Sequence, residues 1–225
     1  MKRLAMATIV GLLAVCGALA QDPVQLRPEN YKVLLENAQV RVLRATRGPH
    51  EKAPMHSHPD YVTIYLTDLN QNITLPDGTV QEVHRKAGTT SFSKAITHAE
   101  DNISDQPLEV VVVELKPNAP HGTGPVPPEL DPAKTDGKYH TVDFENDRVR
   151  VLRTVLEPHI KSPIHAHPNY VVVYLANMHT KMTFPDGTVN DNKRKKGDVA
   201  WRDAVKHTTE NVEDTHAEEI QVELK

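Results

Sequence analysis

The sequence is poor in the residues that several common functions require. Its 225 residues include one cysteine, so neither an internal disulfide nor a cage of thiolate ligands can form. Aromatic residues make up 4% of the chain, which is too few for a surface that stacks nucleic-acid bases. The formal net charge is −4, because 26 basic residues are set against 30 acidic ones. Without a strong positive field, no nucleic-acid partner is expected.

The first twenty residues have the pattern of a secretory signal peptide. Lys2 and Arg3 form a short basic start, and residues 4–20 are uncharged and mostly apolar. We expect cleavage between Ala20 and Gln21, which places the protein in a periplasm or outside the cell. The apolar run is at the short end for a membrane span, so no membrane association is expected after cleavage. The single cysteine, Cys16, lies in this segment, so the mature protein would carry no thiol in an oxidising compartment.

The remainder of the chain consists of two copies of one unit. Residues 36–116 and 145–225 align without a gap, and about 36 of the 81 aligned positions are identical. Solenoid repeats are about 20–50 residues long, so a unit of this length indicates two tandem domains. A proline-rich segment separates the copies, and such chain is extended and cannot join a sheet. We therefore divide the chain into a leader (1–20), a first domain (21–116), a linker (117–138) and a second domain (139–225).

Each unit has the local signals of short β-strands and tight turns. Runs of β-branched and aromatic residues at 61–66 and 170–175 are typical of strands. Pro-Asp-Gly at 76–78 and again at 185–187 favours a hairpin turn. No segment after residue 21 has a sustained apolar period of 3.6 residues. We predict an all-β fold in which each unit is a small sandwich or barrel.

Alternation along the last strand of each unit suggests which face is internal. We place one apolar set inside the barrels: Val111, Val113, Leu115, Ile220, Val222 and Leu224. The opposite set then lies outside: Val110, Val112, Glu114, Glu219, Gln221 and Glu223. The outward valines would be covered by the other domain or by a second subunit, unless they are ordinary surface valines. Arg44 and Arg153 have the inward phase, where they could meet an anionic ligand or form a buried salt bridge.

Histidine is the residue type in excess, with 13 copies against three phenylalanines and one tryptophan. His56 and His58 are two residues apart on an extended segment, so their side chains point to the same side, and His98 follows on a distant strand. The second copy repeats this set as His165, His167 and His207. Three neutral imidazoles suit a divalent ion such as Fe, Zn, Mn, Ni or Cu and leave coordination positions open. Surface histidines would give the same spacing, but its repetition favours a metal site in each unit.

These residues resemble the motifs of the cupin superfamily, and two units make the chain similar to a bicupin. Gly48, His56 and His58 resemble the first cupin motif, and the second motif is matched twice, by Gly88, His98 and Asn102 and by Gly197, His207 and Asn211. The pattern is also similar to small single-cupin proteins linked to β-alanine degradation. The resemblance implies a double-stranded β-helix barrel of the jelly-roll type in each unit, with the metal inside the barrel.

The sequence departs from the cupin pattern at its carboxylate ligand. The family's glutamate would fall at position 62 or 63 in the first unit and at 171 or 172 in the second, and neither unit has an acid there. The remaining three-histidine site resembles the complete site of thiol dioxygenases, and a weakened or vacant site is the alternative. Phe92 and Trp201 precede the third histidines and could wall a pocket or be ordinary core aromatics.

Three hypotheses on function follow. The first is a metal-dependent, dioxygenase-like enzyme that acts on a small organic acid, although no positioned general acid or base is evident. The second is a non-catalytic periplasmic protein that binds a metal or a small molecule, and the third is a structural two-barrel protein with vacant sites. Neutral ligands leave the charge of a divalent ion uncompensated, so a small anionic ligand is the expected partner.

Overall fold

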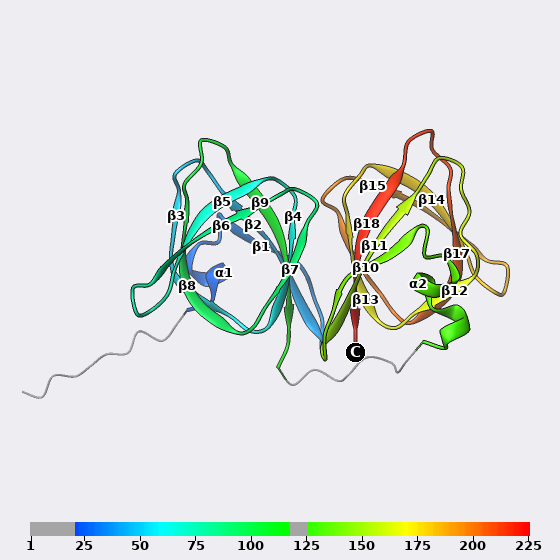
Figure 1. Ribbon diagram of the computed structural model, residues 1–225, viewed down its shortest axis with the longest axis horizontal. Coiled ribbons are helices and arrows are strands. Elements are labelled where there is room, and N and C mark those ends of the chain that lie inside the picture. The colour runs from blue at the N-terminus through cyan, green and yellow to red at the C-terminus, as the bar shows by residue number, and fades with distance from the viewer. Residues whose placement is uncertain (1–20, 118–125) are drawn as a thin grey trace, which may run out of the picture.

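The computed structural model describes residues 21–117 and 126–225, so the predicted leader and Ala20 lie outside the described residues. The chain forms two β-barrels that lie side by side (Figure 1). This confirms the all-β prediction with two tandem jelly-roll barrels. Among the described residues, no helix is long and apolar enough to cross a membrane.

The first barrel is built from two antiparallel sheets. The five-stranded sheet has the order β1-β2-β9-β4-β7, and the four-stranded sheet has the order β3-β8-β5-β6. Its elements are α1 (Pro23–Leu26), β1 (Tyr31–Glu36), β2 (Val40–Arg47), β3 (Lys52–His58), β4 (Tyr61–Tyr65), β5 (Leu69–Thr74), β6 (Val80–Arg85), β7 (Thr90–Ser93), β8 (Ile96–Asn102) and β9 (Leu108–Leu115).

The second barrel repeats this topology, with sheets of order β10-β11-β18-β13-β16 and β12-β17-β14-β15. Its elements are η1 (Pro128–Leu130), α2 (Pro132–Thr135), β10 (His140–Glu145), β11 (Val149–Leu156), β12 (His165–His167), β13 (Tyr170–Tyr174), β14 (Met178–Thr183), β15 (Val189–Arg194), β16 (Val199–Arg202), β17 (Val205–Asn211) and β18 (Ala217–Leu224). The predicted Pro-Asp-Gly turns join β5 to β6 and β14 to β15, with Gly78 and Gly187 at φ of 85° and 83°.

Part of the segment predicted as a linker belongs to the second barrel. Asp131 accepts a hydrogen bond from the backbone N–H of Ala133 and so caps α2, and it pairs with Arg150 on β11 at 3.0 Å. Asp22, at the start of α1, pairs in the same way with Arg41 on β2. The second unit therefore begins upstream of residue 139, and residues 118–125 lie outside the described ranges.

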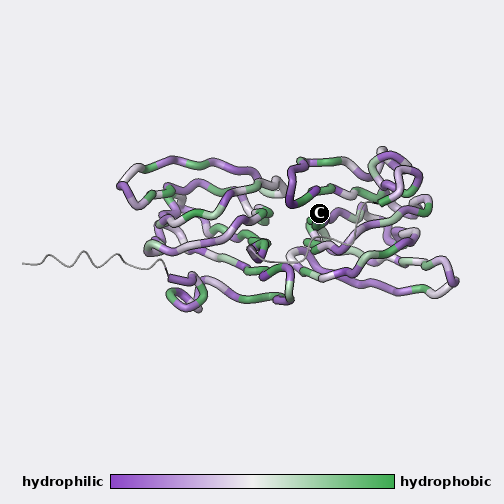
Figure 2. The backbone as a smooth tube through the Cα atoms, turned by 90° about the horizontal axis from the view of Figure 1, so that it is seen from below, coloured by the Kyte–Doolittle hydropathy of each residue, from purple (hydrophilic) through white to green (hydrophobic). Residues whose placement is uncertain are grey.

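The two five-stranded sheets pack against each other, and this contact reverses the predicted inside and outside of the barrels. Strands from both halves contribute to one buried cluster, which includes Val111, Val113, Leu115, Ile220, Val222 and Leu224. These side chains lie between the barrels rather than inside either one. Hydrophobic and hydrophilic residues alternate along the strands (Figure 2), but alternation alone does not show which face lines the lumen.

The face predicted to be external lines the barrel interiors. Val110 and Val112 pack into the core of the first barrel, and they border its cavity. In the second barrel, Glu219 and Gln221 border the corresponding space. The prediction was wrong because both faces of these strands are covered, one by the partner barrel and one by the opposite sheet of the same barrel. The two valines therefore give no reason to expect a second subunit.

The two predicted pocket arginines lie at the contact between the barrels. Arg44 donates a hydrogen bond to the carbonyl oxygen of Gly197, and Arg153 donates to that of Gly88. Each also forms an ion pair on its own barrel, Arg44 with Glu109 at 3.3 Å and Arg153 with Glu218 at 2.6 Å. These arginines therefore join the barrels and do not meet a ligand inside them, because their phase is that of the shared apolar face.

Candidate metal centres

Three predicted histidines of the first barrel converge on one point. His56 and His58 project from β3 to the same side, as an i and i+2 pair on an extended strand must. His98 on β8 is the direct cross-strand partner of His56, and their ring centroids are 4.7 Å apart. One ring nitrogen from each of the three histidines lies within 4.8 Å of the others. The strand register therefore creates the cluster that the spacing predicted.

The second barrel adds a histidine that the sequence analysis missed. His165 and His167 on β12 lie beside His207 on β17, and His165 pairs directly with His207, with ring centroids 4.5 Å apart. His140 on β10 joins them with its ring centroid 4.8 Å from that of His165. A ring nitrogen of His140 lies within 4.8 Å of those of His165 and His167. The repeat could not reveal it, because the first unit has Tyr31 at this position.

A buried glutamate orients one histidine in each barrel. The Nδ1 atom of His58 lies 2.7 Å from Oε1 of Glu114, and that of His167 lies 2.7 Å from Oε1 of Glu223. An arginine on the neighbouring strand donates to the other carboxylate oxygen in each case. A carboxylate on Nδ1 fixes the imidazole tautomer and leaves the lone pair of Nε2 free, which is how metal-binding histidines are commonly supported. Both glutamates were predicted to lie outside the barrels. They occupy equivalent positions in the two copies, and this repetition could have identified them as candidate functional residues.

The buried nitrogens fit a metal ion. In the described residues, Nε2 of His98, His167 and His207 is buried without a hydrogen-bond partner, whereas Nδ1 of His140 faces Oδ2 of Asp136 at 3.5 Å. Burial lowers the pKa of His98 to about 4 and that of His140 to about 3, so both rings are neutral at pH 7. Neutral imidazoles with unpartnered nitrogens leave unsatisfied lone pairs in a dry interior, and a divalent transition metal would satisfy them.

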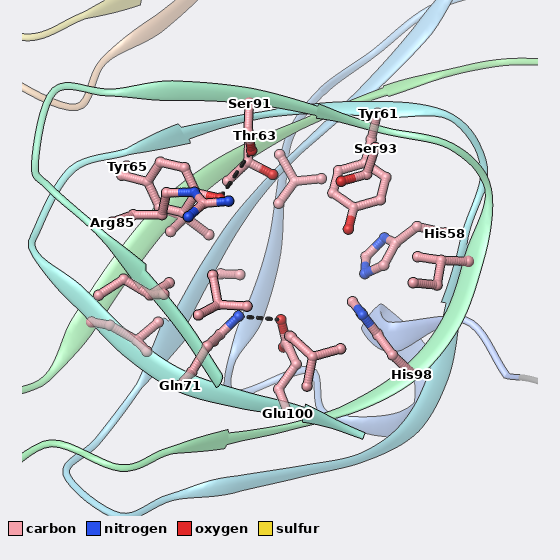
Figure 3. Close-up of a pocket in the computed structure, with 18 of the residues that line it drawn as sticks. His58, Tyr61, Thr63, Tyr65, Gln71, Arg85, Ser91, Ser93, His98 and Glu100 are labelled. Carbon is pink, nitrogen blue, oxygen red and sulfur yellow. Dashed lines mark hydrogen bonds between the residues drawn. The ribbon is translucent and has the colours of Figure 1, made fainter. Parts of the chain in front are cut away.

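The cluster of the first barrel borders a cavity of about 240 Å³. Figure 3 shows His58 and His98 at its wall, with Glu100, Gln71 and Tyr61 also directed into it. The cavity is mixed in character, because valine and leucine side chains from β9 and β5 line it together with charged and polar side chains such as Arg85 and Ser91. Its size suits a ligand of a few heavy atoms, and such a ligand would contact the imidazoles directly. Phe92 borders this cavity but packs against the core between the barrels, and Trp201 packs there without bordering the second cavity.

A charged pair sits beside the first cluster. Arg47 on β2 forms an ion pair with Glu100 on β8, and the hydroxyl of Tyr31 lies 3.0 Å from Oε2 of Glu100 and 3.0 Å from Nε2 of His56. Burial alone would raise the pKa of Glu100, but the charge of Arg47 outweighs it and holds that pKa well below its usual range. Glu100 therefore stays ionised at pH 7 and cannot serve as a general acid.

The second barrel is almost filled. Its remaining cavity measures about 10 Å³, room for about one water molecule. The two residues that carry the charged pair of the first barrel are Leu156 and Thr209 here, so the pair is absent. Gln221 donates to Glu219 at 2.7 Å and accepts from Thr154 at 3.2 Å, and this network occupies the lumen.

Two further histidines recur in both units for a structural reason. His50 and His159 adopt positive φ angles of 55° and 60° in matching turns. Each bonds to an aspartate across its loop, His50 to Asp105 at 2.8 Å and His159 to Asp214 at 2.9 Å. They lie on the surface and belong to neither cluster.

No family model and no curated protein matches this sequence. Similar solved structures include a cupin 2 conserved barrel domain protein from Leptotrichia buccalis, 12% identical over 87% of this chain and 88% of its own, with a TM-score of 0.53. A variant of oxalate decarboxylase from Bacillus subtilis is 13% identical over 90% of this chain and 71% of its own, with a TM-score of 0.58. A variant of salicylate 1,2-dioxygenase from Pseudoaminobacter salicylatoxidans is 13% identical over 83% and 71%, with a TM-score of 0.55. The chain therefore shares the two-barrel fold of these structures.

Proposed function

We propose that each barrel binds a divalent transition metal through its histidine cluster, and that the first barrel is the site of a dioxygenase-like enzyme acting on a small organic acid. The observation that carries this proposal is the convergence of three imidazoles, two of which, His58 and His98, line a cavity of about 240 Å³. Three ligands leave coordination positions open, and the cavity gives a ligand access to them. A metal held there would supply Lewis-acid or redox chemistry to that ligand.

The charge balance of the first barrel favours an anionic ligand. The three histidines are neutral ligands and add no negative charge, and the carboxylate of Glu100 is compensated by Arg47. A small carboxylate would supply the missing negative charge. Gln71, whose side chain lies 3.4 Å from Glu100, is placed to hydrogen-bond a polar group of the ligand. The names of two of the similar structures, an oxalate decarboxylase and a salicylate dioxygenase, refer to small organic acids and support the same substrate class.

The chain's own residues would bind and orient the ligand in this reaction. Tyr61 borders the cavity, and burial raises the pKa of its hydroxyl to about 12, so it remains a proton donor to a bound oxygen atom. The apolar wall formed by Val110 and Val112 excludes water from one side of the ligand. Glu100 holds no proton to give, so it acts by fixing Tyr31 and Arg47.

We further propose that the protein works in a periplasm or outside the cell. The support is the basic start, the apolar run and the small residue at Ala20 in the leader. Mass spectrometry of the mature protein from its native host tests this directly. A first residue of Gln21 is expected, and a retained leader would contradict the proposal.

Elemental analysis after loading with Fe, Zn, Mn, Ni or Cu tests metal binding. We expect one ion per barrel, with His56→Ala reducing the content of the first barrel and His165→Ala that of the second. Oxygen consumption is then measured with a panel of small carboxylates. Activity that His56→Ala abolishes would support the enzyme. A protein that binds none of these ions would refute the whole proposal.

One observation favours a non-catalytic binding protein as the second candidate. Glu100, a carboxylate that borders the first cavity, is already engaged by Arg47 and Tyr31. It therefore offers no free acid or base to a reaction. Isothermal titration calorimetry separates the candidates, because a binding protein would retain a small anion tightly and consume no oxygen with it.

A further inference from the structure

We infer that the two barrels have different tasks: His140 completes a closed four-imidazole structural metal site in the second barrel, and the first barrel stays open to ligands. This inference rests on the proposed metal binding and assigns each site its role. Three independent features of the structure support it.

The first feature is a difference between the two units at one position of their first strands. In the first barrel this position is Tyr31, whose phenol contacts Nε2 of His56 at 3.0 Å but offers no neutral nitrogen lone pair. In the second barrel it is His140, with a ring nitrogen within 4.8 Å of those of His165 and His167. His207 lies beside this group of three, with its ring centroid 4.5 Å from that of His165 and 5.4 Å from that of His167. All four rings of the second barrel are 1–2% exposed.

The second feature is the space beside each cluster. A cavity of about 240 Å³ adjoins the first cluster, whereas about 10 Å³ remains beside the second. Two exchanges on the last strand contribute to this difference, because Val110 and Val112 of the first lumen are replaced by the longer Glu219 and Gln221. A ligand of even a few atoms has no place beside the second cluster.

The third feature is the charged pair. Arg47 and Glu100 border the first cavity, while Leu156 and Thr209 stand at these positions in the second barrel. The second barrel thus lacks the charged pair that borders the first cavity. Structural metal sites are commonly four-coordinate and closed, and reactive sites keep a position open. With His207 as the fourth ligand beside His140, His165 and His167, the second cluster would have the ligand number and the closure of the structural class.

Cobalt(II) replaces many divalent metals and reports coordination by its visible spectrum, and azide is a small anion that binds at open positions. The double variant His56→Ala/His58→Ala removes the first site, and His165→Ala/His167→Ala removes the second. Each full-length protein is loaded with cobalt and titrated with azide. We expect azide to shift the spectrum of cobalt in the first barrel and to leave that of cobalt in the second barrel unchanged.

The outcomes separate this inference from the proposed function. An azide response of cobalt in the second barrel would overturn the closed site and leave the proposed function standing. Cobalt bound only in the first barrel would overturn the closed site and the proposed metal binding of the second barrel, and it would leave the proposed enzyme site of the first barrel standing. Cobalt bound in neither barrel would overturn the proposed function and the inference with it.

His140→Ala in the His56→Ala/His58→Ala background tests the fourth ligand itself. Removing the imidazole opens both a coordination position and the space it occupied. We expect cobalt affinity, measured by chelator competition, to fall by about tenfold or more and the spectrum to become sensitive to azide. His216→Ala, which changes an exposed histidine of the same barrel, is the matched control. Unchanged affinity together with an unchanged spectrum in His140→Ala would show that His140 is no ligand.

Discussion

Glu114 and Glu223 would act on a bound metal indirectly, through the histidine that each of them contacts. Each accepts a hydrogen bond from Nδ1 of a histidine at 2.7 Å and so holds Nε2 toward the cluster. We expect Glu114→Gln to weaken metal binding in the first barrel by about tenfold to a hundredfold, because the charge that makes His58 a stronger ligand is lost. Competition with a chromophoric chelator measures this. Glu82→Gln, on the surface of the same barrel, should leave the affinity unchanged, and equal affinities for the two variants would show that Glu114 has no such role.

Glu219 lines the second lumen, and burial raises its pKa to about 7. Between pH 4.5 and 7 the unfolded chain ionises this carboxyl while the folded chain keeps its proton, so the folded state loses stability as the pH rises. We predict that Glu219→Gln is more stable than the wild type at pH 8, by up to about 3 kcal/mol, and nearly equal to it at pH 4. Urea unfolding at both pH values measures this difference. Glu213→Gln, at an exposed site, is the control, and a stabilisation that does not depend on pH would contradict the explanation.

The histidine clusters show how far single residues could be predicted. The spacing of His56 and His58 and its repetition were enough to predict both triads, because a strand fixes which side chains share a side. His140 could not be found in this way, since it reaches the cluster from a strand whose counterpart carries Tyr31. Its place depends on how the two sheets meet, which spacing along one strand does not encode.

Strand β18 has an apolar face and a polar face, and both are covered. Ile220 is 0% exposed in the core between the barrels, while Glu219 and Gln221 face the lumen. We predict that Ile220→Ala lowers the free energy of unfolding by about 2–5 kcal/mol, because it leaves a cavity in a tightly packed interface. Denaturant unfolding measures the loss. Val189→Ala, at a residue that is 53% exposed, should change the stability by less than about 0.5 kcal/mol, and comparable losses for both would contradict this packing.

The same strand shows why the fold could be predicted and its orientation could not. Period-two alternation identified the strand and its two faces. It gave no means of choosing which face lies in the lumen, because in this molecule the more uniformly apolar face meets the other barrel and the lumen carries Glu219, Gln221 and Glu223. In a single barrel whose exterior faces water, the apolar face would line the lumen and the polar face would lie outside.

The two barrels are held together by more than the chain that joins them. Their five-stranded sheets share one buried core, which contains Val113 and Val222. Arg44 and Arg153 add reciprocal hydrogen bonds to carbonyl groups of the opposite barrel, at Gly197 and Gly88. An apolar face of this kind is stable only when covered, so each barrel depends on the other for burial.

A cut in the connecting chain tests this dependence. We predict that a protein carrying a specific protease site within residues 118–125 stays as one complex after cleavage and elutes from a sizing column with the uncut protein. The shared core should outlast the loss of the covalent link, because strands of both barrels build it. Arg44→Ala/Arg153→Ala removes the reciprocal hydrogen bonds, together with the ion pair of each arginine on its own barrel, and leaves the apolar core in place. The cut variant should therefore still elute mainly as a complex but dissociate at lower denaturant concentrations. Separation of the cut wild-type protein into two folded barrels at micromolar concentration would show that the connecting chain, and not the shared core, holds the molecule together.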